Sequence, residues 1–136
     1  AIPLQWQEWI VASNGKIAIA NPDTAPYGEQ ALHALRYYQL LPTLESRLIR
    51  GESIGQVSQF VRTRAAPIAF TALSALSTEE QAKTDHWRLL PAESHQPIRQ
   101  AAVLLDTNSS SAKAFFAYLY SPPAQKQLQN FGYQLP

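Results

Sequence analysis

Two loops of the sequence could bind an anion through backbone N–H groups. One loop is Asp23–Gly28 (DTAPYG) and the other is Glu52–Gly55 (ESIG), and each precedes a stretch with helical spacing of apolar residues. The first N–H groups of a helix have no partner inside it, and with the helix dipole they attract anions without a cationic side chain. By pattern alone both loops are also ordinary helix caps, because almost every helix begins with one.

Other side chains that could do chemistry form no known catalytic or metal-binding pattern. Three histidines and two aspartates could suggest a metal or an acid–base centre, namely His33, His86, His95, Asp85 and Asp106. Their spacing matches no ligand motif, so we predict no metal. The serines lack a G-x-S-x-G turn, and there is no cysteine. The sequence therefore gives no support for an enzyme.

Composition excludes two further classes of partner. The 136 residues are 46% hydrophobic, which is typical of a globular chain with one core. The 11 basic and 10 acidic side chains leave a formal charge of +1, too little for binding nucleic acid or an anionic membrane surface. Few basic residues accompany Trp6, Trp9 and Trp87, so we expect these rings to pack in a core.

The first loop is expected between a strand and a helix. Lys16–Ala20 (KIAIA) is typical of a strand, which Asn21-Pro22 would end because proline has no N–H to donate. A helix is predicted over Pro26–Leu40, with the proline in its first turn.

The second loop has the same arrangement. Leu48–Arg50 is β-like, and Ser53 with Gln56 three residues later predicts a capping box at the head of a helix. Because ligands of α/β sheets bind at the carboxyl ends of the strands, both loops are expected at that edge.

The rest of the chain continues the alternation of strands and helices. Further strands are predicted at Ala66–Leu73, Trp87–Leu90 and Gln100–Leu105, and a capped helical turn at Ser77–Glu80. Two helices follow, capped near Ser109–Ser111 and Ser121, and Gly132 stands where the second would end. The pattern predicts an α/β fold.

Several strings of the sequence resemble periplasmic molybdate-binding proteins. The most distinctive is KIAIANPDTAPYG, at Lys16–Gly28. Similar strings follow in the family's order at Gly51–Val61 (GESIGQVSQFV), Ala66–Ser74 (APIAFTALS), Pro97–Leu105 (PIRQAAVLL) and Lys113–Tyr133 (KAFFAYLYSPPAQKQLQNFGY).

The resemblance implies a type II periplasmic-binding-protein fold, in which two α/β lobes joined by a hinge close on a ligand. Residues 1–97 would then be most of the second lobe, with a mixed sheet flanked by helices. Residues 98–136 would be a hinge strand and C-terminal helices that return to the first lobe. The first lobe would be largely missing from these 136 residues.

The same resemblance implies binding through the backbone. The family's first contact in this lobe is an N–H that falls at Tyr27, with Ala25 and Gly28 in the same loop. The next is an N–H that falls at Ile54, beside Ser53.

A third contact in some members is a tyrosine hydroxyl, and its position falls at Ala72, which has no hydroxyl. Either a neighbour such as Thr71 or Tyr27 substitutes for it, or this chain follows the branch that dispenses with the bond.

The implied function is that of the substrate-binding component of a molybdate/tungstate ABC transporter. Its ligand would be molybdate or tungstate, with no cofactor, and its partner a membrane permease. It would be periplasmic, or lipid-anchored outside the cytoplasmic membrane. Two alternatives remain: the effector-sensing domain of a regulator with the same fold, or a non-binding fragment that dimerises or swaps domains.

Overall fold

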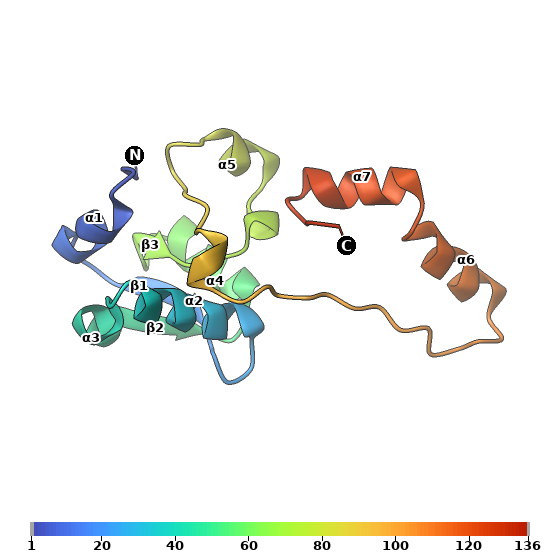
Figure 1. The fold of residues 1–136 in the computed structure, drawn as a ribbon, viewed down its shortest axis with the longest axis horizontal. Coiled ribbons are helices and arrows are strands. Elements are labelled where there is room, and N and C mark those ends of the chain that lie inside the picture. The colour runs from blue at the N-terminus through green and yellow to red at the C-terminus, as the bar shows by residue number, and fades with distance from the viewer. Residues whose placement is uncertain (1, 136) are drawn as a thin grey trace. The chain divides into compact units, whose positions relative to one another are not determined.

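The computed structural model describes residues 2–135 and divides into two compact units, Ala1–Ile98 and Arg99–Pro136. The second unit contains helices α6 (Ser110–Tyr118) and α7 (Pro122–Asn130). The first unit, shown with its labels in Figure 1, contains strands β1 (Ile17–Ala20), β2 (Leu48–Gly51) and β3 (Ile68–Ala69) and helices α1 (Trp6–Ala12), α2 (Pro26–Tyr37), α3 (Leu41–Leu44), α4 (Ile54–Arg62) and α5 (Thr78–Ala82). Short 3-10 turns lie at Glu45–Arg47, Leu73–Ala75 and Ala92–Ser94.

The three strands of the described chain form a parallel sheet in the order β2-β1-β3. Ile17 of β1 pairs with Leu48 on one side and with Ile68 on the other. The α/β prediction is confirmed, but the prediction of a mixed sheet is wrong. A helical crossover lies between each strand and the next, and such a connection returns the chain in the same direction.

Two predicted strands do not form in the described residues. Gln100–Leu105 is irregular and largely solvent-exposed, with Leu105 90% exposed, and no sheet edge pairs with it. Trp87–Leu90 is also irregular, and its backbone carbonyl at Trp87 accepts a hydrogen bond from the Arg88 guanidinium at 2.9 Å. The strand expected over Ala66–Leu73 is only Ile68–Ala69, because the chain turns into a 3-10 helix at Leu73. A β-like composition forms no strand without a partner.

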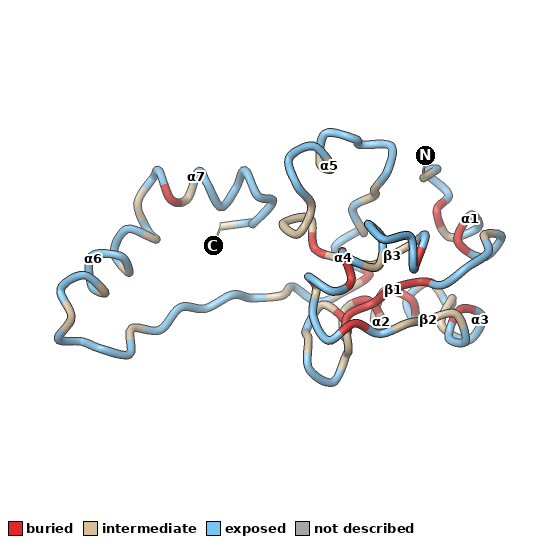
Figure 2. The backbone as a smooth tube through the Cα atoms, turned by 180° about the vertical axis from the view of Figure 1, so that it is seen from behind, coloured by how far each residue is buried: buried red, intermediate tan, exposed pale blue. Residues whose placement is uncertain are grey.

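The core lies on both faces of β1, where the buried residues gather in Figure 2. One face packs against α1, α2 and α3 through Trp6, Ile10, Ile17, Leu35 and Leu44. The other face packs against α4 through Ala18, Ala20, Val57 and Ala66. Trp6 meets Tyr38 edge to face at 5.1 Å, which confirms that this tryptophan is a core residue.

The helix boundaries follow their capping residues. The box of Ser77 and Glu80 is complete, and Ser109 and Ser121 cap α6 and α7 as predicted. Helix α2 ends at Tyr37 rather than Leu40, because Gln39 turns to φ 57° and the Leu40 N–H bonds back to the carbonyl of Leu35 at 2.8 Å.

The second unit has little core of its own. Its exposed apolar side chains are Val103, Leu105, Phe115, Tyr118, Tyr120, Leu128, Phe131 and Tyr133. In α7 the buried residue is Ala124. Among the residues described, no helix is both long and apolar enough to cross a membrane.

Candidate functional site

Both candidate loops lie at the carboxyl edge of the parallel sheet, as predicted. Ala20, the last residue of β1, pairs in register with Gly51, the last residue of β2. The chain then enters α2 after the first strand and α4 after the second. The N-termini of α2 and α4 therefore follow two neighbouring strands and lie at the same edge of the sheet.

Asn21 joins these two loops. Its N–H donates to the carbonyl of Gly51 at 2.7 Å, which extends the pairing of β1 with β2 into the loops. Its carbonyl accepts from Thr24 and Ala25 at 3.2 and 2.8 Å, and its side-chain Oδ1 accepts from Asp23 at 3.2 Å. The strand end predicted at Asn21 does not include these bonds, although an asparagine before such a turn is a known signal for them.

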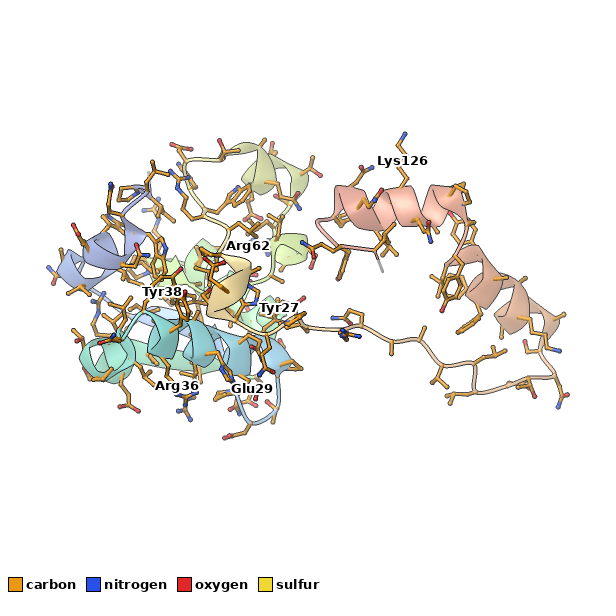
Figure 3. All side chains as sticks on the ribbon, in the orientation of Figure 1. Tyr27, Glu29, Arg36, Tyr38, Arg62 and Lys126 are labelled. Atoms are coloured by element: carbon orange, nitrogen blue, oxygen red, sulfur yellow. The ribbon has the colours of Figure 1, made fainter. Side chains whose placement is uncertain are left out.

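Helix α2 begins without a side-chain cap, because its N-cap residue is Ala25. Pro26 has no N–H, so Tyr27 (Figure 3) supplies the first N–H of the helix. The next two, of Gly28 and Glu29, point to the carbonyl of Ala25 at 2.9 and 3.4 Å. The first turn of α2 therefore presents the Tyr27 backbone at the carboxyl edge.

Helix α4 begins with two N–H groups that make no hydrogen bond to any described residue, those of Ile54 and Gly55. The neighbouring donors are occupied. Ser53 Oγ accepts from the N–H of Gln56 at 3.2 Å, and Gln56 Oε1 accepts from the N–H of Glu52 at 2.7 Å. The predicted capping box is thus half formed, since its return bond goes to Glu52 rather than to Ser53.

Tyr27 and Ile54 pack against the same hydrophobic cluster. Both pack, with Ala25, against the α4-facing cluster of Ala18 and Ala20. The residues expected to supply the two backbone contacts therefore share one hydrophobic cluster.

Gly28 has a packing reason to be glycine. A Cβ at this position would lie 2.0 Å from the carbonyl oxygen of Ala20 and 2.8 Å from the nitrogen of Pro22. Only a residue without a side chain lets α2 start this close to the end of β1. At Gly55 a Cβ would meet nothing nearer than Ser53 Oγ at 3.6 Å.

A third loop follows β3 at the same edge. Ala72, where the resemblance places a tyrosine, is 6% exposed and begins the 3-10 turn by accepting the N–H of Ala75 at 3.0 Å. Its neighbour Thr71 has a buried hydroxyl oxygen with no hydrogen-bond partner among the described residues.

Charge does not single out this edge. The segments 21–29 and 51–55 contain the exposed carboxylates Asp23, Glu29 and Glu52 and no lysine or arginine. An anion there would be held by N–H dipoles.

The cationic hollow of the first unit lies at the opposite edge. It measures about 440 Å³ and is lined by Val11, Ser13, Asn14, Gly15, Lys16, Thr43 and Arg47. The Arg47 guanidinium already donates to the carbonyls of Gly15 and Ile10, both at 2.9 Å, and to Ser13 Oγ at 3.2 Å. Arg47 therefore joins the end of α1 to the start of β1.

A second hollow, of about 410 Å³, lies between α2 and residues 93–96 and includes His33 and His95. Within residues 2–135, no group of three or more histidines and carboxylates is placed to hold a metal ion.

The sequence matches a known protein family and several characterised proteins. Residues 3–134 match the family model described as bacterial extracellular solute-binding protein. The chain is 36% identical over 119 residues to the molybdate-binding protein ModA of Rhodobacter capsulatus, covering 86% of this chain and 46% of that protein. It is 36% identical over 121 residues to ModA of Azotobacter vinelandii, covering 88% of this chain and 48% of that protein.

The fold agrees with this similarity. The solved periplasmic molybdate-binding protein of Azotobacter vinelandii superposes with a TM-score of 0.78 at 26% identity, covering 96% of this chain and 59% of that one. The chain spans about half the length of the curated relatives it matches. The matching family is one of solute-binding proteins rather than enzymes. The chain belongs to the bacterial extracellular solute-binding protein family.

Proposed function

We propose that this chain is part of the substrate-binding component of a molybdate/tungstate ABC transporter. The observation that carries the proposal is the pair of helix starts at one sheet edge, where Ile54 and Gly55 keep N–H groups that bond to no described residue. The 36% identity to two proteins named for molybdate binding supports the choice of ligand.

In this proposal the oxyanion accepts hydrogen bonds from the backbone N–H groups of Tyr27 and Ile54. Ala25 and Gly28 belong to the first loop, and Ser53 caps the helix that follows the second loop. Ala72 lies in the third loop, after β3, and has no side-chain hydroxyl to donate to the anion. Fixed neutral dipoles suit a dianion, because they need no partner charge and do not reorganise when the ligand arrives. Selection against sulfate would then depend on the size of the cavity.

The remaining parts of the proposal follow the family. Residues 1–97 would form one lobe of a two-lobed receptor, and 98–136 would contain its hinge and the helices that return to the other lobe. The second unit has exposed aromatic side chains, which are consistent with a surface that another part of a larger receptor covers: Phe115 and Tyr118 in α6, and Tyr120, Phe131 and Tyr133 beside α7. The loaded receptor would deliver molybdate to a membrane permease from the periplasm, or from a lipid anchor outside the cytoplasmic membrane.

Calorimetric titration of the protein encoded by the complete open reading frame tests this function. Molybdate and tungstate should bind at micromolar concentration or below, and sulfate should bind at least about a hundredfold more weakly, a difference of about 2.7 kcal/mol. Tight binding of sulfate, or no heat with molybdate and tungstate, would reject the proposal.

A further inference from the structure

Thr71 lies at the carboxyl edge of the sheet, the same edge from which α2 and α4 begin. Ala18 pairs with Ala69 of β3, and the N–H of Phe70 donates to the carbonyl of Ala18 at 2.9 Å. Continuing this register by two residues brings Thr71 opposite Ala20, which itself pairs with Gly51. The end of β3 therefore reaches the same edge as the loops that lead into α2 and α4.

Thr71 also belongs to the face that carries the proposed donors. Side chains alternate between the two faces of a strand, and Ala69 packs on the face of Ala18 and Ala20, whereas Phe70 packs on the other. The alternation returns Thr71 to the face of Ala69. Tyr27 and Ile54 pack against that face as well.

The hydroxyl of Thr71 makes no hydrogen bond to the described residues although its oxygen is buried. A buried hydroxyl without a partner destabilises the fold, so each such group in a structure calls for an explanation. Rotation about χ1 moves the hydroxyl between staggered positions without moving the backbone.

We propose that the Thr71 hydroxyl is a third, side-chain donor to the oxyanion, beside the backbone groups of Tyr27 and Ile54. The inference rests on the proposed function and adds a specificity-determining residue to it. The Thr71 hydroxyl has no hydrogen-bond partner among the described residues of the ligand-free chain, and an oxygen of the bound anion would accept its hydrogen bond. Ligand binding would thereby remove the destabilisation caused by the unpaired hydroxyl.

Ser58 provides a matched control. It lies on α4 one turn after Ile54, is 7% exposed, and its hydroxyl is likewise buried without a partner in the described chain. Ser58 is inside the helix rather than at the sheet edge. Like Thr71, Ser58 has a buried hydroxyl without a partner in the described chain, but it does not lie at the proposed site.

The test compares Thr71→Val, Thr71→Ser and Ser58→Ala in the protein encoded by the complete open reading frame. Thr71→Val should weaken molybdate binding about tenfold or more, the loss of one hydrogen bond to a charged group, and should leave the ligand-free melting temperature unchanged or higher. Thr71→Ser keeps the hydroxyl and should bind within about threefold of wild type. Ser58→Ala should behave like Thr71→Val in melting but bind molybdate as wild type does.

The outcomes separate the two proposals. Wild-type protein that does not bind molybdate rejects the proposed function itself. Wild type that binds, together with Thr71→Val of equal affinity, overturns only the role of Thr71. A Thr71→Val protein that melts well below wild type, while Thr71→Ser does not, also overturns it, because the hydroxyl then has a structural partner.

Discussion

The two edges of the small parallel sheet differ in how they use their polar groups. The amino edge has the positive charges, Lys16 and Arg47, and the larger of the two hollows. The Arg47 side chain donates hydrogen bonds to the carbonyls of Ile10 and Gly15 and to Ser13 Oγ. The carboxyl edge has no cation in its first two loops, yet Ile54 and Gly55 keep N–H groups without a partner among the described residues.

Under the proposed function, this difference means that positive charge alone does not locate the anion site. Arg47 already makes three hydrogen bonds to the protein, which stabilise the fold and hold its guanidinium in place. A neutral helix start offers donors in a fixed direction. Arg47 therefore has a structural role at the amino edge, whereas the proposed binding site lies at the carboxyl edge.

The largest expected effect comes from Gly28→Ala at the carboxyl edge. The new Cβ would lie 2.0 Å from the carbonyl oxygen of Ala20, which is backbone and cannot move aside. We expect a loss of about 3 kcal/mol or more in the free energy of unfolding, measured by urea denaturation. The control is Gly55→Ala, whose Cβ has room and gains helix propensity, so its stability should be unchanged or up to about 1 kcal/mol higher. Equal stability of the two variants would show that α2 does not start against β1 as described.

An intermediate effect is expected from Arg47→Ala at the amino edge. Removing three hydrogen bonds from a charged donor should lower the free energy of unfolding by about 2 kcal/mol. Molybdate affinity of the folded variant, measured by titration, should stay within about twofold of wild type. The control Arg50→Ala removes the same charge from an exposed residue of β2 whose side chain makes no hydrogen bond within residues 2–135. If Arg47→Ala abolished binding without changing stability, the assignment of the two edges would be reversed.

The smallest effect concerns the C-terminal end of α4, far from Ile54. There Arg62 forms a two-pronged ion pair with Glu80, at 3.1 and 3.0 Å. The Arg62 hydrogen bond, followed by that of the Ser77 N–H, lowers the pKa of Glu80 from 4.5 to about 2. The folded chain therefore holds the ionised carboxylate more tightly than the unfolded chain, and this stabilisation is lost as the pH falls from about 4.5 to 2.

Glu80→Gln tests that contribution. The stability of wild type should fall more steeply than that of the variant between pH 4.5 and 2, followed by thermal melting at each pH. The difference should be small, because the Arg62 side chain is 52% exposed and the pair is screened by solvent. Parallel curves would mean that the ion pair does not stabilise the fold in solution.

Local signals in the sequence predicted the starts of both helices at the site. Pro26 and Ser53 act through their own backbone and side-chain chemistry, so their effects are readable without the tertiary fold. The sequence shows that residue 28 is glycine, but the close approach to Ala20 that requires a glycine depends on where α2 meets β1.

The errors concern features that need a partner elsewhere in the chain. Gln100–Leu105 has a strand-like composition but no strand beside it, and the mixed sheet inferred from the family is parallel in the described residues. The sequence also could not predict that the Thr71 hydroxyl is buried without a hydrogen-bond partner, because burial depends on the residues packed around it.

The central claim, that backbone N–H groups at the carboxyl edge bind the oxyanion, is tested most directly by Ile54→Pro. Proline is favoured at the first position of a helix, Ser53 before it is already extended at φ −151° and ψ 163°, and the Ile54 N–H bonds to no described residue. The substitution therefore removes the proposed donor at little structural cost. Ile54→Ala keeps the N–H and serves as the control for the lost side chain.

Molybdate should be titrated into both variants of the protein from the complete open reading frame, with the melting temperature of each recorded beforehand. We expect Ile54→Pro to melt near Ile54→Ala and to bind molybdate at least about tenfold more weakly than it, as for one lost hydrogen bond to an anion. Equal molybdate affinity of the proline and alanine variants would contradict the account.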